Sequence, residues 1–133
     1  ADTAVAAELS VPARDVRLLV LEGNSGRNLA FGPVLLDGSN GSRDRVINGH
    51  RDTHFRFLQH LQPGDLLRVA DRGGSRWFAV EDFEVVDSRS HELIIDHSVE
   101  RLSLVTCYPF DSPVAGGPLR YVVTAYPLAP VTE

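Results

Sequence analysis

Short apolar stretches alternate with clusters of Gly, Pro, Asn and Asp along the whole chain. This pattern is typical of β-strands that are joined by turns. It predicts strands at Val16–Leu21, Arg45–Gly49, Leu66–Asp71, Arg76–Asp87 (bent near Asp82), Glu92–Ile95, Arg101–Cys107 and Leu119–Tyr126. Several short strands with little helix predict an all-β fold, which closes either as a barrel or as a sandwich.

Turn residues and one amphipathic segment complete the predicted elements. The glycines between Asp71 and Ser75 indicate a hairpin turn, because glycine adopts positive φ without strain. A helix is predicted to begin at Asp52 or Thr53, as its N-cap, and to end at Pro63. A second short helical turn is predicted at Asn24–Ala30. The apolar face of the first helix consists of Phe55, Leu58 and Leu61.

The composition is that of an ordinary soluble protein. Apolar residues make up 43% of the 133 positions and charged residues 23%, so we predict one domain over residues 1–133 with a real core. The net charge of −5, without a basic tail, argues against nucleic acid as a partner. All 13 basic residues are arginines, which excludes chemistry that needs a lysine, such as Schiff-base formation.

The only cysteine, Cys107, stands at the end of a predicted strand and is followed by Tyr108-Pro109. If the leucines of this strand point into the core, the thiol points away from it, because side chains alternate along a strand. Proline cannot donate to a ladder, so pairing ends here and a substrate can reach the thiol. The two faces consist of Leu102, Leu104 and Thr106, and of Ser103, Val105 and Cys107.

Two further polar residues are predicted to stand at strand ends. Residues 108–119 are rich in Pro and Gly and can link two antiparallel strands, which would bring Arg120 beside Cys107. An arginine there can stabilise a thiolate or a developing oxyanion. His50 follows another strand, where it can donate a proton to a leaving amine. The three residues form a candidate acyl-transfer site, although the convergence of the strand ends does not follow from the sequence alone.

Several motifs of the chain resemble those of sortases. Residues 103–107 (Ser-Leu-Val-Thr-Cys) are similar to the Thr-Leu-x-Thr-Cys signature, residues 49–55 to the Gly-His segment, and residues 119–123 to the arginine strand. Residues 9–12 and 21–25 resemble the first strand of the family and the turn after it. The order His, Cys, Arg and the spacings agree over nearly the whole chain. The Cys-Tyr-Pro-Phe run is most similar to class D or class E members.

The resemblance implies a closed eight-stranded β-barrel with one or two short helices, anchored in the cytoplasmic membrane and facing the outside of the cell. Sortases are cysteine transpeptidases that cleave a sorting signal such as Leu-Pro-x-Thr-Gly through a thioacyl intermediate. They then transfer the surface protein to an amine of the cell envelope. By resemblance, Cys107 is the nucleophile, His50 the acid and base, and Arg120 the oxyanion or substrate clamp, while Thr106 and Tyr108 bind substrate. Ser103, where the signature has Thr, is a departure for which we expect a mild effect.

Other interpretations stay open beside the transpeptidase. The barrel could be a binding module without turnover, or a cysteine hydrolase that uses water as its acceptor. We expect no cofactor and no metal: His50 and His54 have a zinc-like spacing, but His50 precedes the predicted helix and the glutamate of a His-Glu-x-x-His motif is absent. The sequence has no methionine, so we expect Ala1 to follow a longer precursor with a membrane anchor upstream.

Overall fold

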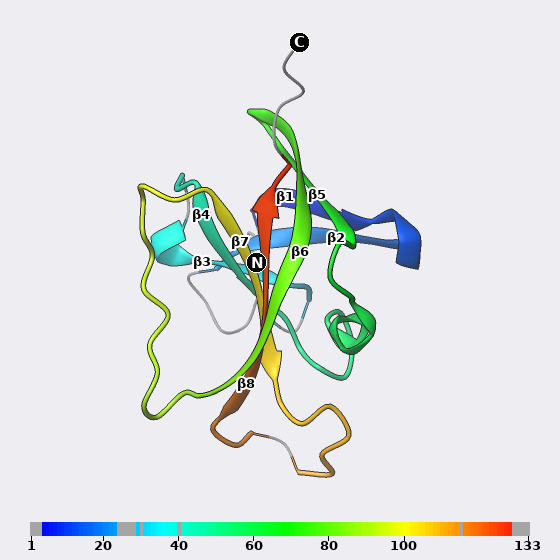
Figure 1. Ribbon diagram of the computed structural model, residues 1–133, viewed down its shortest axis with the longest axis vertical. Helices are drawn as coiled ribbons and strands as arrows, with labels where there is room; N and C mark the ends of the chain where they lie inside the picture. The colour runs from blue at the N-terminus through cyan, green and yellow to red at the C-terminus, as the bar shows by residue number, and fades with distance from the viewer. Residues whose placement is uncertain (1–3, 24–28, 30, 40, 115, 129–133) are drawn as a thin grey trace.

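The computed structural model describes residues 4–23, 29, 31–39, 41–114 and 116–128, and its strands close into one barrel (Figure 1). The predicted all-β fold is therefore confirmed, and the barrel rather than the sandwich is formed. The strands are β1 (Val5–Val11), β2 (Val16–Gly23), β3 (Val34–Leu36), β4 (Asp44–Asn48), β5 (Leu66–Asp71), β6 (Gly74–Asp87), β7 (Arg101–Cys107) and β8 (Leu119–Pro127).

Around the barrel the strands follow the order β1-β2-β3-β4-β7-β8-β6-β5. Most neighbours are antiparallel, but β4 runs parallel to β7, and β2 runs parallel to β3. Because β4 and β7 are parallel, they end at the same rim of the barrel, and the antiparallel β8 begins there. Three strand ends that are far apart in the sequence therefore meet at one rim, the lower one in Figure 1.

The helices are short and of the 3-10 type: η1 (Pro12–Arg14), η3 (Asp37–Ser39) and η4 (Arg56–His60). The predicted apolar face of the segment after His50 is confirmed, because Phe55, Leu58 and Leu61 are buried. The predicted cap at Asp52 or Thr53 is wrong, since η4 begins only after Phe55 and no side chain caps it. The turn predicted at Asn24–Ala30 falls almost wholly outside the described residues. No helix in the described part of the chain is long and apolar enough to span a membrane.

The set of predicted strands needs correction. Residues Glu92–Ile95 form no strand but belong to the long connection between β6 and β7, where Leu93 and Ile95 pack on the outside of the barrel. Their apolar side chains find burial there without joining a ladder. The pattern of the chain did not reveal β3, because three residues are too few to show an alternation, and it did not reveal β1, of which only residues 9–11 were expected through the family resemblance. The predicted hairpin at Asp71–Ser75 is confirmed, with Asp71 paired to Gly74.

The outer face of β4, β7, β8 and β6 carries a second apolar cluster. Its buried members are valines, which Leu36, Leu93 and Ile95 cover from outside. The interior of the barrel is filled separately by the main core, which includes Leu9, Leu67, Phe78, Leu102 and Val123. The strand β6 bends where its register to β8 shifts, between Val80 and Asp82, as the sequence predicted. The valines of the outer cluster are Val46, Val86, Val105 and Val122.

A buried ion pair ties the beginnings of β4 and β7 together. The carboxylate of Asp44, which is 1% exposed, accepts hydrogen bonds from the guanidinium of Arg101 at 2.6 and 3.0 Å. It also accepts the backbone N–H of Asp96, at 2.9 Å, from the β6–β7 connection. Burial alone would raise the pKa of Asp44, but these hydrogen bonds and the charge of Arg101 outweigh it and hold that pKa below 3.8.

We expect Asp44→Asn to lower the free energy of unfolding at neutral pH by about 2–3 kcal/mol, because Arg101 loses its charged partner. Because the pKa of Asp44 is depressed in the folded state, its contribution is present above the unfolded pKa and is lost as the pH falls through the folded pKa. Urea unfolding of both proteins, from pH 7 down through roughly pH 4 to 2, should therefore show the difference shrinking in acid.

The matched control is Asp87→Asn, which breaks the exposed pair between Asp87 and Arg89 (2.7 Å). Solvent screens that pair, so the control should unfold almost as the unaltered protein does. Equal losses in the two variants would contradict a special role for the Asp44–Arg101 pair.

Candidate active site

The thiol of Cys107 lies at the end of β7, on the outer side of the barrel. Leu102 and Leu104 of the same strand are fully buried in the interior, whereas Val105 belongs to the outer cluster. Cys107 lies on the same face of the strand as Val105, because side chains alternate along a strand. The prediction that the thiol points away from the core is therefore confirmed. The residue is half-buried and its sulfur is free.

Arg120 stands directly opposite Cys107 in the antiparallel ladder of β7 and β8. The N–H of Tyr108 donates to the carbonyl of Leu119 at 3.1 Å, which makes Cys107 and Arg120 a pair without mutual hydrogen bonds. The Cα atoms of such pairs are about 4.5 Å apart, and their side chains are close. The adjacency predicted from the spacing is therefore confirmed.

The guanidinium of Arg120 is held by backbone carbonyls rather than by a carboxylate. Its Nη1 donates to the carbonyl of Gly117 at 2.7 Å and to that of Leu119 at 2.9 Å. Within the described part of the chain, Nε and Nη2 have no hydrogen-bond partner. Arg120 thus keeps its charge uncompensated and has donors left for a ligand.

His50 reaches the same rim through the parallel pairing of β4 with β7. Asn48 pairs with Val105, and the N–H of Gly49 donates to the carbonyl of Val105 at 3.0 Å. This register places the exposed His50 level with Cys107. The buried hydroxyl of Thr106 donates to the carbonyl of Gly49 at 2.6 Å and fixes the backbone just before His50.

The chain folds back sharply after His50, and Gly49 makes this possible. The N–H of Phe55 donates to the carbonyl of His50 at 3.0 Å. A Cβ on Gly49 would lie 2.6 to 3.0 Å from ring carbons of Phe55, which is fully buried and cannot yield. Only glycine fits here, so Gly49 and Phe55 together set the position of His50.

Arg51 is a structural member of this rim that the sequence reasoning missed. It is 6% exposed, and its Nη2 donates to the carbonyl of Val114 at 2.7 Å, in the connection between β7 and β8. Its Nη1 is buried without a hydrogen-bond partner. In a chain whose cations are all arginines, nothing in the sequence marks this one. The contact links the turn after His50 to the segment that carries Arg120.

A hollow of about 290 Å³ lies where these elements meet, and Cys107, His50, Arg120 and Thr106 all line it. Gly23 of β2, Val34 of β3 and Leu29, which lies between these strands in the chain, help to complete the wall. The structure thus brings the three catalytic candidates together. Among the described residues, no three His, Cys, Asp or Glu side chains are grouped so that they could hold a metal ion.

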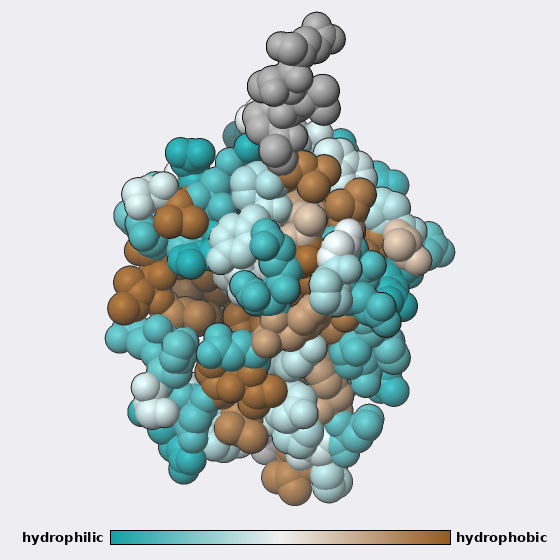
Figure 2. All heavy atoms as spheres, viewed as in Figure 1, coloured by the Kyte–Doolittle hydropathy of each residue, from teal (hydrophilic) through white to brown (hydrophobic). Residues whose placement is uncertain are grey.

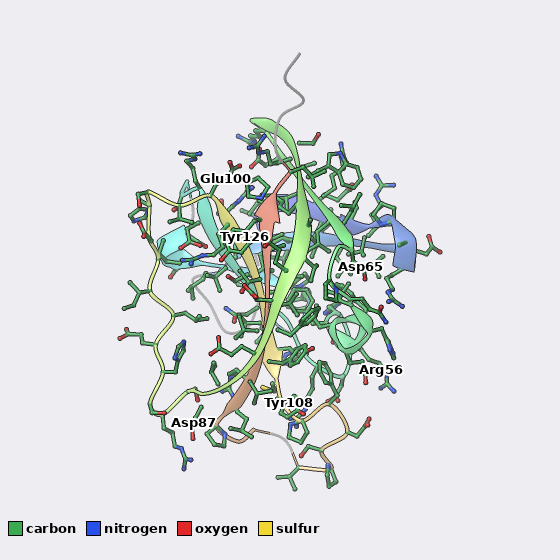
Figure 3. The ribbon with its side chains drawn as sticks, in the orientation of Figure 1. Arg56, Asp65, Asp87, Glu100, Tyr108 and Tyr126 are labelled. Atoms are coloured by element: carbon green, nitrogen blue, oxygen red, sulfur yellow. The ribbon has the colours of Figure 1, made fainter. Side chains whose placement is uncertain are left out.

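Tyr108 is placed differently from the other site residues. Its ring stacks on Tyr121, with centroids 5.8 Å apart, and meets the edge of Phe110 at 6.1 Å. It lies near the end of β7 in Figure 3 but is not part of the wall of the hollow. Substrate binding by Tyr108 and Thr106 stays a prediction, and both side chains already have contacts within the protein.

A sequence model described as the Sortase domain matches residues 9–128. This chain belongs to the sortase family. It is similar to Sortase D of Bacillus subtilis (strain 168), with 33% identity over 119 residues that cover 86% of the chain and 60% of the relative. It is also similar to Sortase A of Bacillus anthracis, with 25% identity over 125 residues that cover 90% and 58%. The chain spans about 60% of the length of these relatives.

Solved sortases have the same barrel. Sortase A from Corynebacterium diphtheriae superposes with a TM-score of 0.83 at 26% identity, covering 98% of this chain and 64% of that one. A Clostridium perfringens Sortase D5 transpeptidase shares the fold with a TM-score of 0.79 at 19% identity, covering 94% and 79%. The similarity to Sortase D is compatible with the predicted class D- or class E-like character.

In this sortase domain we expect Thr106→Val to lower kcat/KM for peptide cleavage about tenfold, because the buried carbonyl of Gly49 loses its donor and His50 follows directly. Thr106→Ser keeps the hydroxyl and should stay within about twofold of the unaltered protein. Steady-state cleavage of one sorting peptide, with thermal unfolding of each variant, measures this. Equal activity of the Val and Ser variants would show that the hydrogen bond does not position His50.

Proposed function

We propose that this sortase domain is a cysteine transpeptidase that cleaves a C-terminal sorting signal of the Leu-Pro-x-Thr-Gly type and transfers the surface protein to an amine acceptor. The observation that carries the proposal is the placement of Cys107 directly opposite Arg120, in one hollow with His50. Family membership supports the general reaction. Activity, substrates and partners of the whole protein are part of the proposal, since the chain spans only a portion of its relatives.

In the first half of the reaction, the sulfur of Cys107 attacks the carbonyl carbon of the Thr residue in the signal. The carbonyl oxygen becomes an oxyanion, which accepts hydrogen bonds from the free donors of Arg120. When the C–N bond breaks, protonated His50 donates its proton to the leaving amine. The product is a thioester between Cys107 and the surface protein.

In the second half, the nitrogen of the acceptor amine attacks the thioester and His50 takes up its proton. The C–S bond then breaks, the thiolate of Cys107 is regenerated, and an amide joins the surface protein to the acceptor. Arg120 serves the oxyanion of both halves because it lies next to the thiol throughout. Thr106 acts in this scheme by holding Gly49, so that His50 stays within reach of the leaving group.

The proposed location is the cell envelope, on the outer side of the cytoplasmic membrane. Sortases act at the cell envelope, and an amine acceptor and surface proteins are found there. A membrane anchor upstream of residue 1 is part of this proposal. Peptides of the Leu-Pro-x-Thr-Gly and Leu-Ala-x-Thr-Gly types, offered with and without an added amine, test the substrate and the acceptor together.

We expect Cys107→Ala to abolish cleavage while the barrel stays folded, because the thiol lies at a rim and not in the packed interior. Mass spectrometry of peptide products, with circular dichroism as the control for folding, measures this. Cleavage by pure variant protein at a few per cent of the original rate would refute the mechanism. Products that ignore the added amine would identify a hydrolase, and a folded protein that binds but never cleaves would identify a binding module.

We expect Arg120→Lys to lower kcat/KM by about 10²- to 10³-fold although the charge is kept, which is the usual cost of losing an oxyanion donor. The guanidinium is oriented by two carbonyls, whereas a lysine ammonium is a point charge on a flexible stem. The matched control is Arg72→Lys, at an exposed turn remote from the rim. A loss below about threefold would remove Arg120 from the chemistry.

A further inference from the structure

A second hollow lies on the same outer face as the thiol, farther along β7. It has a volume of about 470 Å³, within the range of about 300–1,000 Å³ that is common for ligand sites. Its floor is formed by residues of β4, β7, β8 and β6, and the β6–β7 connection forms its outer side. Figure 2 shows apolar side chains recessed on the left of the molecule, inside this connection.

The ladder pairings give the position of this hollow relative to the thiol. Cys107 pairs with Arg120, and four ladder positions farther along Ser103 pairs with Thr124, which in turn pairs with Asp82. Ser103 and Cys107 are four positions apart along the strand, or about 13 Å. If the scissile carbonyl of an extended peptide lies at the thiol, the residue about four positions before that carbonyl therefore lies beside Ser103 and Thr124.

The charges that face the second hollow are not balanced within the protein. Its one arginine, Arg101, is engaged with the carboxylate of Asp44. Asp82 and Glu84 on β6 and Glu92 on the connection also line it, and none of them has an ion-pair or hydrogen-bond partner in the described part of the chain. We call the hollow with these three carboxylates the carboxylate groove.

A serine on the floor of the carboxylate groove points to a ligand independently of the charges. Ser103 lines the carboxylate groove and is only 5% exposed, yet no described residue hydrogen-bonds its hydroxyl. Its hydroxyl therefore faces the hollow with its hydrogen-bonding capacity unused among the described residues. A ligand with N–H donors would satisfy Ser103 and the carboxylates together.

We propose that the carboxylate groove binds a lysine or arginine side chain of the substrate, at the position just before the sorting motif. The long apolar stem of such a residue suits the floor formed by Val46 and Val122, while its charged end reaches Asp82 and Glu84. The leaving segment departs past His50, beyond the end of β4, so the segment before the scissile bond lies over the sheet. This inference rests on the proposed function and adds a charge preference to it.

The test uses peptides that share one cleaved sorting motif and differ only in the residue before it, which is Lys, Gln or Glu. The unaltered protein should cleave the Lys peptide with a kcat/KM about fivefold above that of the Gln peptide, and the Glu peptide more slowly than either. The preference should weaken as salt is added, because the carboxylates are solvent-accessible.

Two double variants examine the groove itself. Asp82→Asn with Glu84→Gln should cleave all three peptides at similar rates, and Asp82→Lys with Glu84→Lys should favour the Glu peptide. The control Glu81→Gln removes a charge from the same strand outside the groove and should keep the original order. Circular dichroism and thermal unfolding confirm that each variant is folded. The proposal would be overturned if the unaltered protein showed no preference for the Lys peptide, or if the neutral double variant kept that preference.

Further measurements separate this proposal from the proposed function. Peptide affinities for Cys107→Ala protein, measured by fluorescence anisotropy, should show the same fivefold order without any turnover. If the affinities follow this order but no peptide is cleaved, the carboxylate groove is supported and the transpeptidase proposal is refuted. If peptides are cleaved but their rates and affinities do not depend on the residue before the motif, the transpeptidase is supported and the groove proposal is refuted. If the double variants changed only the concentration of acceptor amine that is needed for transfer, the groove would bind the acceptor amine, and the proposal would be overturned.

Discussion

The parallel pairing of β4 with β7 is the constraint on which the site depends. Parallel neighbours end at the same rim, so His50 and Cys107 meet although η4, β5 and β6 lie between them in the chain. A buried polar contact fastens each end of the pair: Asp44 with Arg101 at the beginning, and Thr106 with Gly49 at the end. A slip by one residue would turn Cys107 into the interior, and both contacts oppose it.

The candidate site lies on the outside of the barrel because the interior is full. Apolar side chains from almost every strand occupy the interior, which leaves the outer face as the surface that a peptide can reach. That face carries four valines that would be exposed without a cover. The β6–β7 connection supplies this cover through Leu93 and Ile95, and Asp44 holds the connection through the N–H of Asp96. The ion pair between the beginnings of β4 and β7 therefore also holds the connection that covers this outer face.

Local patterns predicted the parts of the site that depend on neighbours in the chain. The alternation along 101–107 predicted the direction of Cys107, and a Pro- and Gly-rich link predicted the pairing with Arg120. The approach of His50 to Cys107 depends on the pairing of β4 with β7, which are distant in the sequence. A single sequence does not reveal such a pairing without the family resemblance. The sequence did not predict the packing of Leu93 and Ile95 or the burial of Arg51 for the same reason. An apolar run or an arginine can occupy many different environments, and its contacts depend on residues that are distant in the chain.

The arginines differ in their partners, and as a result charge is unevenly distributed along the outer face. Arg14, Arg17, Arg43, Arg45, Arg76, Arg89 and Arg101 are paired with carboxylates. Arg120 and Arg51 donate to backbone carbonyls instead, which orient the guanidinium without cancelling its charge. Two arginine charges without a carboxylate partner among the described residues therefore lie at the rim of the thiol, which suits the oxyanion of the proposed acyl transfer. The far end of the face carries carboxylates that have no partner among the described residues, and this charge distribution is the basis of the proposal that a positive charge precedes the carbonyl that is attacked.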